Sequence, residues 1–306
     1  MAHALSSILM AAAALTASAF MDVVGRDASS QGAEGSEVSL LQTHASVRAG
    51  RRGAEAGKGW PQPGDPNLQP DAWQVNALRW LKIFPRDVKI VNTSLSTVAL
   101  TPTWYVIQEG GYDVLFRALH DFADEPTVQM NAWRGLSDQS WTELGAQHIA
   151  NYGGPNKGIE YMVEQLLAHP EAKTALCADH LTYQYETLQC IGGLLSSDVN
   201  GTRGAAAVDA GLLEAAVHAM RVEADLRPTQ HTACTALCLL LQHSGAAHER
   251  YAQRLRDLGA VELVKNDLAT YSLIDPTPFY YGTTYGEVYP LVPQCQDVLD
   301  NIKSAP

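Results

Sequence analysis

The sequence predicts an all-α fold, a right-handed solenoid of about four helical repeats. A glycine that begins an apolar pattern with helical spacing occurs at Gly111, Gly158, Gly211 and Gly259, at intervals of 47, 53 and 48 residues. A period of this length, carried by helical patterns, is typical of stacked repeats in which each unit buries its apolar face against its neighbours.

Two segments are expected before the folded part. Residues 1–19 are interpreted as a secretory signal peptide, because the apolar run 8–15 is too short to span a bilayer and residues 17–19 form a small-residue cleavage site. Residues 20–69 are rich in Gly, Ala, Ser and Pro and contain few large apolar residues, so we expect a disordered linker. The pair Arg51-Arg52 within it is a candidate processing site.

These features predict entry into the secretory pathway, with the extracellular space or the ER lumen as destination. The alternative is a plastid reached through a bipartite presequence, because Phe20 directly follows the cleavage point. No later apolar run is long enough for a transmembrane segment. The formal net charge of −12 argues against nucleic acid and anionic membranes as partners and favours a basic or neutral partner.

The folded part is predicted to consist of a repeat domain, residues 70–270, and a Pro- and Tyr-rich C-terminal cap, residues 271–306. Asp71 is placed to cap a first helix, whose apolar residues are expected to lie in the core: Trp73, Val75, Leu78, Trp80 and Leu81. In the C-terminal cap we expect four tyrosines to pack over the last repeat rather than to form a binding platform: Tyr280, Tyr281, Tyr285 and Tyr289. A short amphipathic helix with Val298, Leu299 and Ile302 follows.

Each repeat has the same expected order of elements. A short polar helix precedes the glycine, a helix of about ten residues follows it, and a polar break leads to a second helix with small apolar residues. Ala132, Leu188 and Ala233 align in these second helices. The second unit is longer because "AKTALCADHL" is inserted before its second helix.

The repeats resemble the armadillo family. The resemblance rests on two stretches, residues 106–136 and 207–237. In both, the same order recurs: Val or Ile, Gly, an apolar helix, Pro-Thr, Gln, Ala and Leu. It covers about residues 85–270. It implies recognition of an extended peptide or a partner protein along the second-helix ridge. Peptide-binding members typically carry Asn near the end of that helix, whereas the positions here are Asp138, Leu194 and Leu239, which argues against nuclear-import-type binding.

We therefore predict a non-enzymatic scaffold that binds a peptide or protein on the concave solenoid face. Trp133, Arg134, Gln189 and His231 are the candidate partner-binding residues, with packing between repeats as the alternative for Trp133. The alternative function is an enzyme, or an accessory subunit of one, with a site between the repeats and the C-terminal aromatic segment. A structural component of a larger assembly is a third hypothesis.

No catalytic residue, metal site or cofactor is predicted, because the sequence lacks H-E-x-x-H, G-x-S-x-G and G-x-G-x-x-G patterns. Cys234 and Cys238 lie four apart on an expected helix, where they need two further ligands to hold zinc and are expected to be buried thiols. Cys177 and Cys190 are a candidate disulfide in an oxidising compartment. The triplets at Asn92 and Asn200 are candidate N-glycosylation sites.

Overall fold

The glycine-marked repeats fold into successive groups of α-helices, in a computed structural model that describes residues 69–168, 182–271 and 291–304. All of these residues belong to one compact unit of the chain, Pro61–Pro306. Within the described ranges there is no β-strand, which confirms the all-α prediction. None of the helices described there has both the length and the hydrophobicity that crossing a membrane requires.

Three helices make up each glycine-marked group. The first group contains α5 (Thr103–Gln108), α6 (Gly111–Asp121) and α7 (Pro126–Ser140). The second contains α8 (Glu143–Ala150), α9 (Lys157–Ala168) and α10 (Tyr183–Ser196). The third contains α11 (Thr202–Asp209), α12 (Leu212–Val222) and α13 (Arg227–His243). The fourth contains the 3-10 turn η1 (Gly245–Ala247), α14 (His248–Asp257), α15 (Ala260–Tyr271) and α16 (Leu291–Ser304). Two further helices, α3 (Ala72–Ile83) and α4 (Val88–Val98), precede all four groups.

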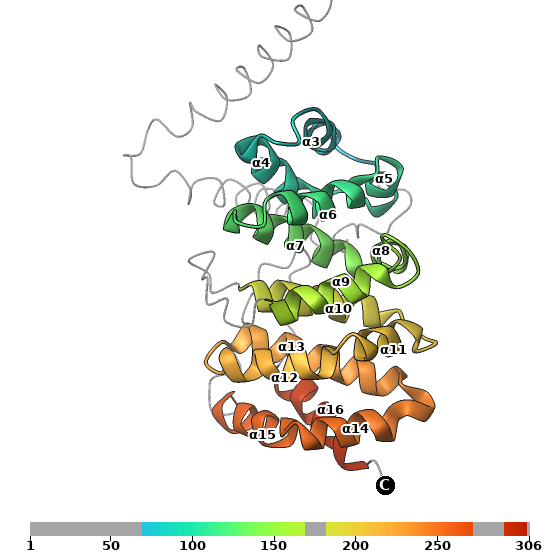
Figure 1. The fold of residues 1–306 in the computed structure, drawn as a ribbon, viewed down its shortest axis with the longest axis vertical. Helices are drawn as coiled ribbons and strands as arrows, with labels where there is room; N and C mark the ends of the chain where they lie inside the picture. Colours follow the sequence, from blue (N-terminus) through green and yellow to red (C-terminus); the bar gives the residue numbers. More distant parts are fainter. Residues whose placement is uncertain (1–68, 169–181, 272–290, 305–306) are drawn as a thin grey trace, which may run out of the picture. The chain divides into compact units, whose positions relative to one another are not determined.

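The third helices of the groups pack against one another in a row that begins with α4. Helix α4 contacts α7, α7 contacts α10, α10 contacts α13 and α13 contacts α16, and these are among the most extensive helix pairings of the described residues (Figure 1). Val298, Leu299 and Ile302 of α16 are buried, as their amphipathic spacing predicts. Helix α16 therefore extends the row beyond α13.

The marker glycines begin helices for two different reasons. Gly211 and Gly259 have φ angles of 102° and 76°, a left-handed region that side chains with a Cβ rarely adopt. At Gly158 the constraint is space, because a Cβ there would overlap the carbonyl oxygen of Ile149 near the end of α8. At these three positions the glycine in the sequence thus meets a local requirement at the start of the second helix.

A buried glutamine joins the second and third helices in two of the groups. The Gln129 amide donates hydrogen bonds to the carbonyl oxygens of Leu119 and Phe122, at 2.8 and 2.9 Å, at the end of α6. The Gln230 amide makes the equivalent bonds at the end of α12, at 2.9 and 2.8 Å. Because the last carbonyls of a helix lack partners within it, these amides satisfy buried acceptors and explain why a glutamine recurs at this position.

The first helix agrees with the sequence in part, because Val75 and Trp80 are half-buried and Trp73 is exposed. Asp71 is the N-cap of α3 and forms a capping box with Gln74, as its position predicts. Leu78 and Leu81 are buried in the core. Trp73 is 40 % exposed, because it lies in the first turn of the helix, where its indole donates to Asp71 rather than packing inward.

Several predictions fall on residues outside the described ranges. These are the signal peptide 1–19, almost all of the linker 20–69 with Arg51-Arg52, the inserted segment with Cys177, and the tyrosines Tyr280, Tyr281, Tyr285 and Tyr289. The aromatic segment proposed to border an enzyme site is part of this set.

Candidate functional site

The predicted partner-binding residues lie on three neighbouring helices of the row. Trp133 and Arg134 are on α7, Gln189 is on α10 and His231 is on α13. Because α7 contacts α10 and α10 contacts α13, the three helices form one continuous surface of the fold. The surroundings of the four side chains differ, and this decides which of them can meet a partner.

Trp133 is a core residue. Its side chain is fully buried, its ring stacks on Tyr161 of α9 at a centroid distance of 6.4 Å, and the ring of Tyr183 of α10 meets it edge-on at 5.5 Å. The indole thus joins two successive groups. The partner-binding prediction does not hold for Trp133, because its side chain is inaccessible, and the alternative of packing between repeats describes its position.

Arg134 lies beside two acidic residues. Arg134 is half-buried on α7. Its positive charge acts on Glu186 of α10, and so does the negative charge of Asp138, which lies one helical turn further along α7. Glu186 is only 5 % exposed, and burial raises the pKa of its carboxyl to about 8, with Arg134 lowering it and Asp138 raising it. Much of the Glu186 population is therefore protonated at neutral pH and able to donate a hydrogen bond.

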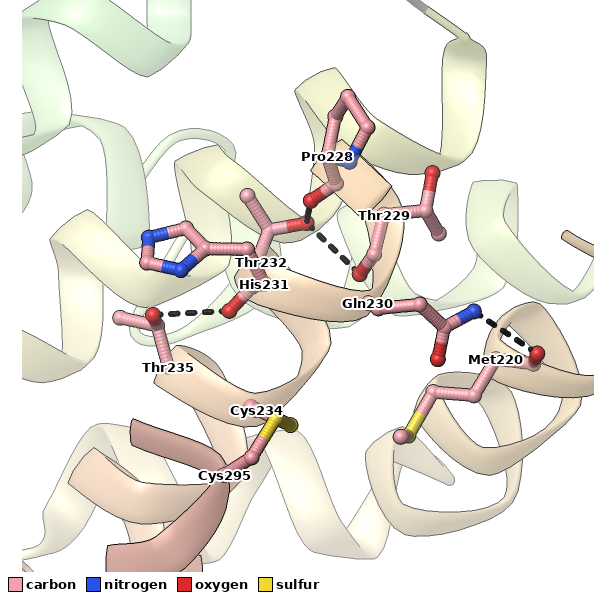
Figure 2. The surroundings of a disulfide bond; sticks show 9 residues. All are labelled: Met220, Pro228, Thr229, Gln230, His231, Thr232, Cys234, Thr235 and Cys295. Atoms are coloured by element: carbon pink, nitrogen blue, oxygen red, sulfur yellow. Dashed lines mark hydrogen bonds between the residues drawn. A yellow bond between two sulfur atoms is a disulfide. The ribbon is translucent and has the colours of Figure 1, made fainter. Parts of the chain in front are cut away.

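His231 occupies on α13 the position that Glu186 occupies on α10, two residues before the aligned Ala233 and Leu188. Its side chain leaves α13 on the side opposite to Gln230 (Figure 2). His231 is buried, and burial together with the charge of Arg227 lowers the pKa of its imidazole to about 4. The ring is neutral at physiological pH and carries one donor and one acceptor nitrogen.

Gln189 is half-buried on α10, three residues after Glu186 and so on the same side of the helix. We refer to Arg134, Asp138, Glu186, Gln189 and His231 as the α7/α10/α13 face. Glu186 is not among the residues predicted from the sequence, and Asp138 appears there only as the position of a replaced asparagine. The available signal was an ionisable residue within the otherwise apolar helix "YETLQCIGGLL".

Replacing Glu186 with glutamine should remove a pH dependence of stability. The folded-state pKa of about 8 exceeds the ordinary value of 4.5, so the folded protein holds this proton more tightly than the unfolded chain, and the Glu186 contribution falls as pH rises from about 4.5 to 8. We expect Glu186→Gln to match the wild type near pH 4.5 and to exceed it increasingly up to pH 8, with a limiting slope of about 1.4 kcal/mol per pH unit. Urea unfolding of both proteins at matched pH values measures this difference, and a difference independent of pH would contradict it.

The cysteines pair differently from the prediction. Cys190 is a free thiol, fully buried in α10, and burial raises its pKa, so the structure gives no support to the Cys177–Cys190 disulfide. Cys177 lies outside the described residues. Cys234, expected to be a buried free thiol like Cys238, forms a disulfide with Cys295 of α16 (Figure 2). The reason is that α16 packs directly on α13, which brings the two Cα atoms within 5.2 Å.

The two glycosylation triplets lie in different surroundings. Asn92 is half-buried within α4, where its side-chain oxygen accepts a hydrogen bond from the Asn131 amide at 2.6 Å. Asn200 is exposed in the turn between α10 and α11. Accessibility therefore favours Asn200 as the acceptor.

Comparisons with known proteins inform the fold alone. No protein-family model matches the chain, and no curated protein matches it. The crystal structure of an engineered protein, Northeast Structural Genomics Consortium target OR366, is similar with a TM-score of 0.52 and 20 % sequence identity, over 76 % of this chain and 99 % of the engineered one. A second engineered protein, target OR497, has a TM-score of 0.45 and 17 % identity over 76 % of this chain and 59 % of its own. The first likeness is compatible with a repeated helical architecture.

Proposed function

We propose that the helical domain is a right-handed solenoid of armadillo-like units that acts as a non-enzymatic scaffold and binds a protein or peptide on the α7/α10/α13 face. The recurring order of three helices, the glycine at the start of each second helix and the continuous row of third helices support the solenoid. The signal peptide and a secretory or plastid destination remain part of this proposal.

The observation that carries the proposal is the set of ionisable and amide side chains at successive positions of the row. A helix row built only for stability would carry apolar residues where Asp138, Glu186 and His231 are buried, because burying ionisable groups costs free energy. Groups with strongly shifted pKa values gather at functional sites more often than elsewhere. The face is therefore a better candidate for recognition than the apolar parts of the same helices.

The half-buried members of this face, Arg134 and Gln189, are the ones that a partner could reach. The Arg134 guanidinium donates hydrogen bonds and the Gln189 amide both donates and accepts them, which is what the alternating N–H and C=O groups of an extended peptide backbone require. Glu186 and His231 are buried, like Trp133, and are not proposed to touch the partner. Recognition of a backbone in this way agrees with the neutral or basic partner that the net charge favours.

The test is affinity capture with a matched pair of variants. The tagged full-length chain is used to recover partners from its native cells, in parallel with an Arg134→Ala/Gln189→Ala variant and an Arg254→Ala control. Arg254 lies on α14 and pairs with Glu214 at 2.7 Å in an exposed ion pair, so its loss should have little effect on stability. We expect the same protein with the wild type and the control, and its loss with the double variant.

Binding is then measured with the purified partner. The double variant should bind about 10-fold more weakly or worse, since arginine is frequent among residues that dominate binding energy, while its unfolding free energy stays close to that of the control. Equal affinity of all three proteins would show that the partner binds elsewhere. Recovery of the chain with a small molecule instead of a protein would favour the enzyme alternative.

A further inference from the structure

A second cluster of reactive side chains lies where α13 packs against α15 and α16, and its first member is about one helical turn along α13 from His231. Cys234 of α13, Asp267 of α15 and Cys295 of α16 bring their sulfur atoms and a carboxylate oxygen within 4.8 Å of one another. All three residues are buried, with exposed fractions of 0 %, 7 % and 0 %. Figure 2 shows the disulfide that joins the first and third of them.

Asp267 is unusual for a residue of a helical core. Among the described residues, its buried Oδ2 atom has no hydrogen-bond partner and no ion pair involves it. A buried carboxyl with an unpartnered oxygen costs free energy unless another group compensates it, and the atoms beside it are two cysteine sulfurs.

We propose that Cys234, Asp267 and Cys295 form a zinc site when the Cys234–Cys295 disulfide is reduced. Two thiolates and a carboxylate are ligands that Zn²⁺ accepts, whereas Mg²⁺ and Ca²⁺ require sets of oxygen ligands. Zinc takes four ligands in tetrahedral geometry, so three protein ligands leave one position for a water molecule or another small ligand. The sulfurs are consumed by the disulfide, so the oxidised protein and the zinc-bound protein exclude each other.

The exchange between the two forms balances with a dithiol as reductant. The dithiol gives two electrons and two protons, its own sulfurs become a disulfide, and the Cys234–Cys295 bond opens to two thiols. Zinc binding then displaces both thiol protons into solvent. Two thiolates and one carboxylate carry a charge of about −3, which a bound Zn²⁺ reduces to about −1. Without the ion, repulsion between three anions this close together favours the protonated forms of the three side chains.

Cys238 provides the matched control. It lies one turn beyond Cys234 on the same helix and is also buried, but it is a free thiol and does not belong to the cluster. Its sulfur accepts a hydrogen bond from the Gln242 amide at 3.2 Å. Cys238→Ser therefore removes one buried thiol from α13 without removing a proposed ligand.

The experiment titrates the reduced full-length chain, freed of reductant, with Co²⁺ and then with Zn²⁺. We expect one Co²⁺ per chain, a thiolate-to-cobalt charge-transfer band, and loss of that band as Zn²⁺ displaces cobalt. The oxidised protein should show no such band. Cys238→Ser should behave as the wild type, whereas Cys234→Ser and Cys295→Ser should lose the band. Asp267→Asn should weaken zinc binding by more than about 10-fold, since even partners outside the ligand shell contribute 10–100-fold to metal affinity.

Four outcomes would overturn the proposal: no charge-transfer band in the reduced wild type, the same band in the oxidised protein, an unchanged band in Cys234→Ser, or equal losses in Cys238→Ser and Cys234→Ser. Circular dichroism of each variant shows whether it has folded. If the cysteine variants do not fold, the comparison of reduced with oxidised wild type and the near-isosteric Asp267→Asn still decides the question.

Discussion

Replacing Trp133 with alanine is expected to lower the free energy of unfolding by about 3–5 kcal/mol, the usual range for emptying a large aromatic site in a core. The indole is fully buried between α7, α9 and α10, where Tyr161 and Tyr183 pack against it. These two rings belong to the group after that of Trp133, so its loss weakens the contact between groups as well as the core itself. Denaturant unfolding followed by circular dichroism measures the change.

Trp73 is the control for this prediction. It is also a tryptophan on a helix of the same unit, but it is 40 % exposed. Trp73→Ala should cost less than about 1 kcal/mol, as most surface substitutions do. Equal losses in the two variants would contradict the assignment of Trp133 to the core.

Removing the Cys234–Cys295 disulfide is expected to cost about 2–4 kcal/mol of unfolding free energy. The two cysteines are 61 residues apart in the sequence, and closing a loop of this length restricts the unfolded chain strongly. The measurement compares the oxidised wild type with Cys234→Ala/Cys295→Ala by guanidinium unfolding. A metal chelator is present throughout, so that no ion substitutes for the bond.

The reduced wild type in chelator is the control for the disulfide. It keeps both sulfur atoms and lacks only the bond, so it should unfold near the midpoint of the double variant. A double variant as stable as the oxidised wild type would contradict the expectation. A reduced wild type far more stable than the double variant would mean that packing of the sulfur atoms, rather than the bond, supplies the stability.

The glycine period predicted where the second helices begin because glycine is a backbone requirement at those points. Gly211 and Gly259 adopt φ angles that other residues avoid, and Gly158 leaves room for the Ile149 carbonyl. Such requirements are local, and local requirements are visible in a sequence. The predicted starts of α9, α12 and α15 therefore agree with the structure.

The candidate binding residues were harder to predict because helix α7 is buried around much of its circumference. Its residues 135–140 are all buried, so periodicity does not separate a core side from an exposed ridge. Trp133 and Arg134 are adjacent in sequence, yet one is enclosed between rings and the other lies beside Glu186. Their different roles follow from the neighbouring helices, which a single-helix pattern does not contain.

The cysteine cluster was missed for a related reason. Cys234 can hold a metal ion only together with further ligands. Asp267 and Cys295 lie on two later helices, whose positions relative to Cys234 depend on tertiary packing. Asp267 looks in the sequence like an ordinary polar residue of a helix surface. Only the packing of α16 on α13 and α15 brings the three together.

The bond between Cys234 and Cys295 also changes what a protease can release from the oxidised chain. Helices α14 and α15 lie in the sequence between the two cysteines, so one cut anywhere between them leaves both fragments covalently attached. Such a nicked chain would migrate as an intact molecule on a non-reducing gel and separate into two pieces only after reduction. The end of the helix row can therefore lose the continuity of its backbone without losing any of its parts.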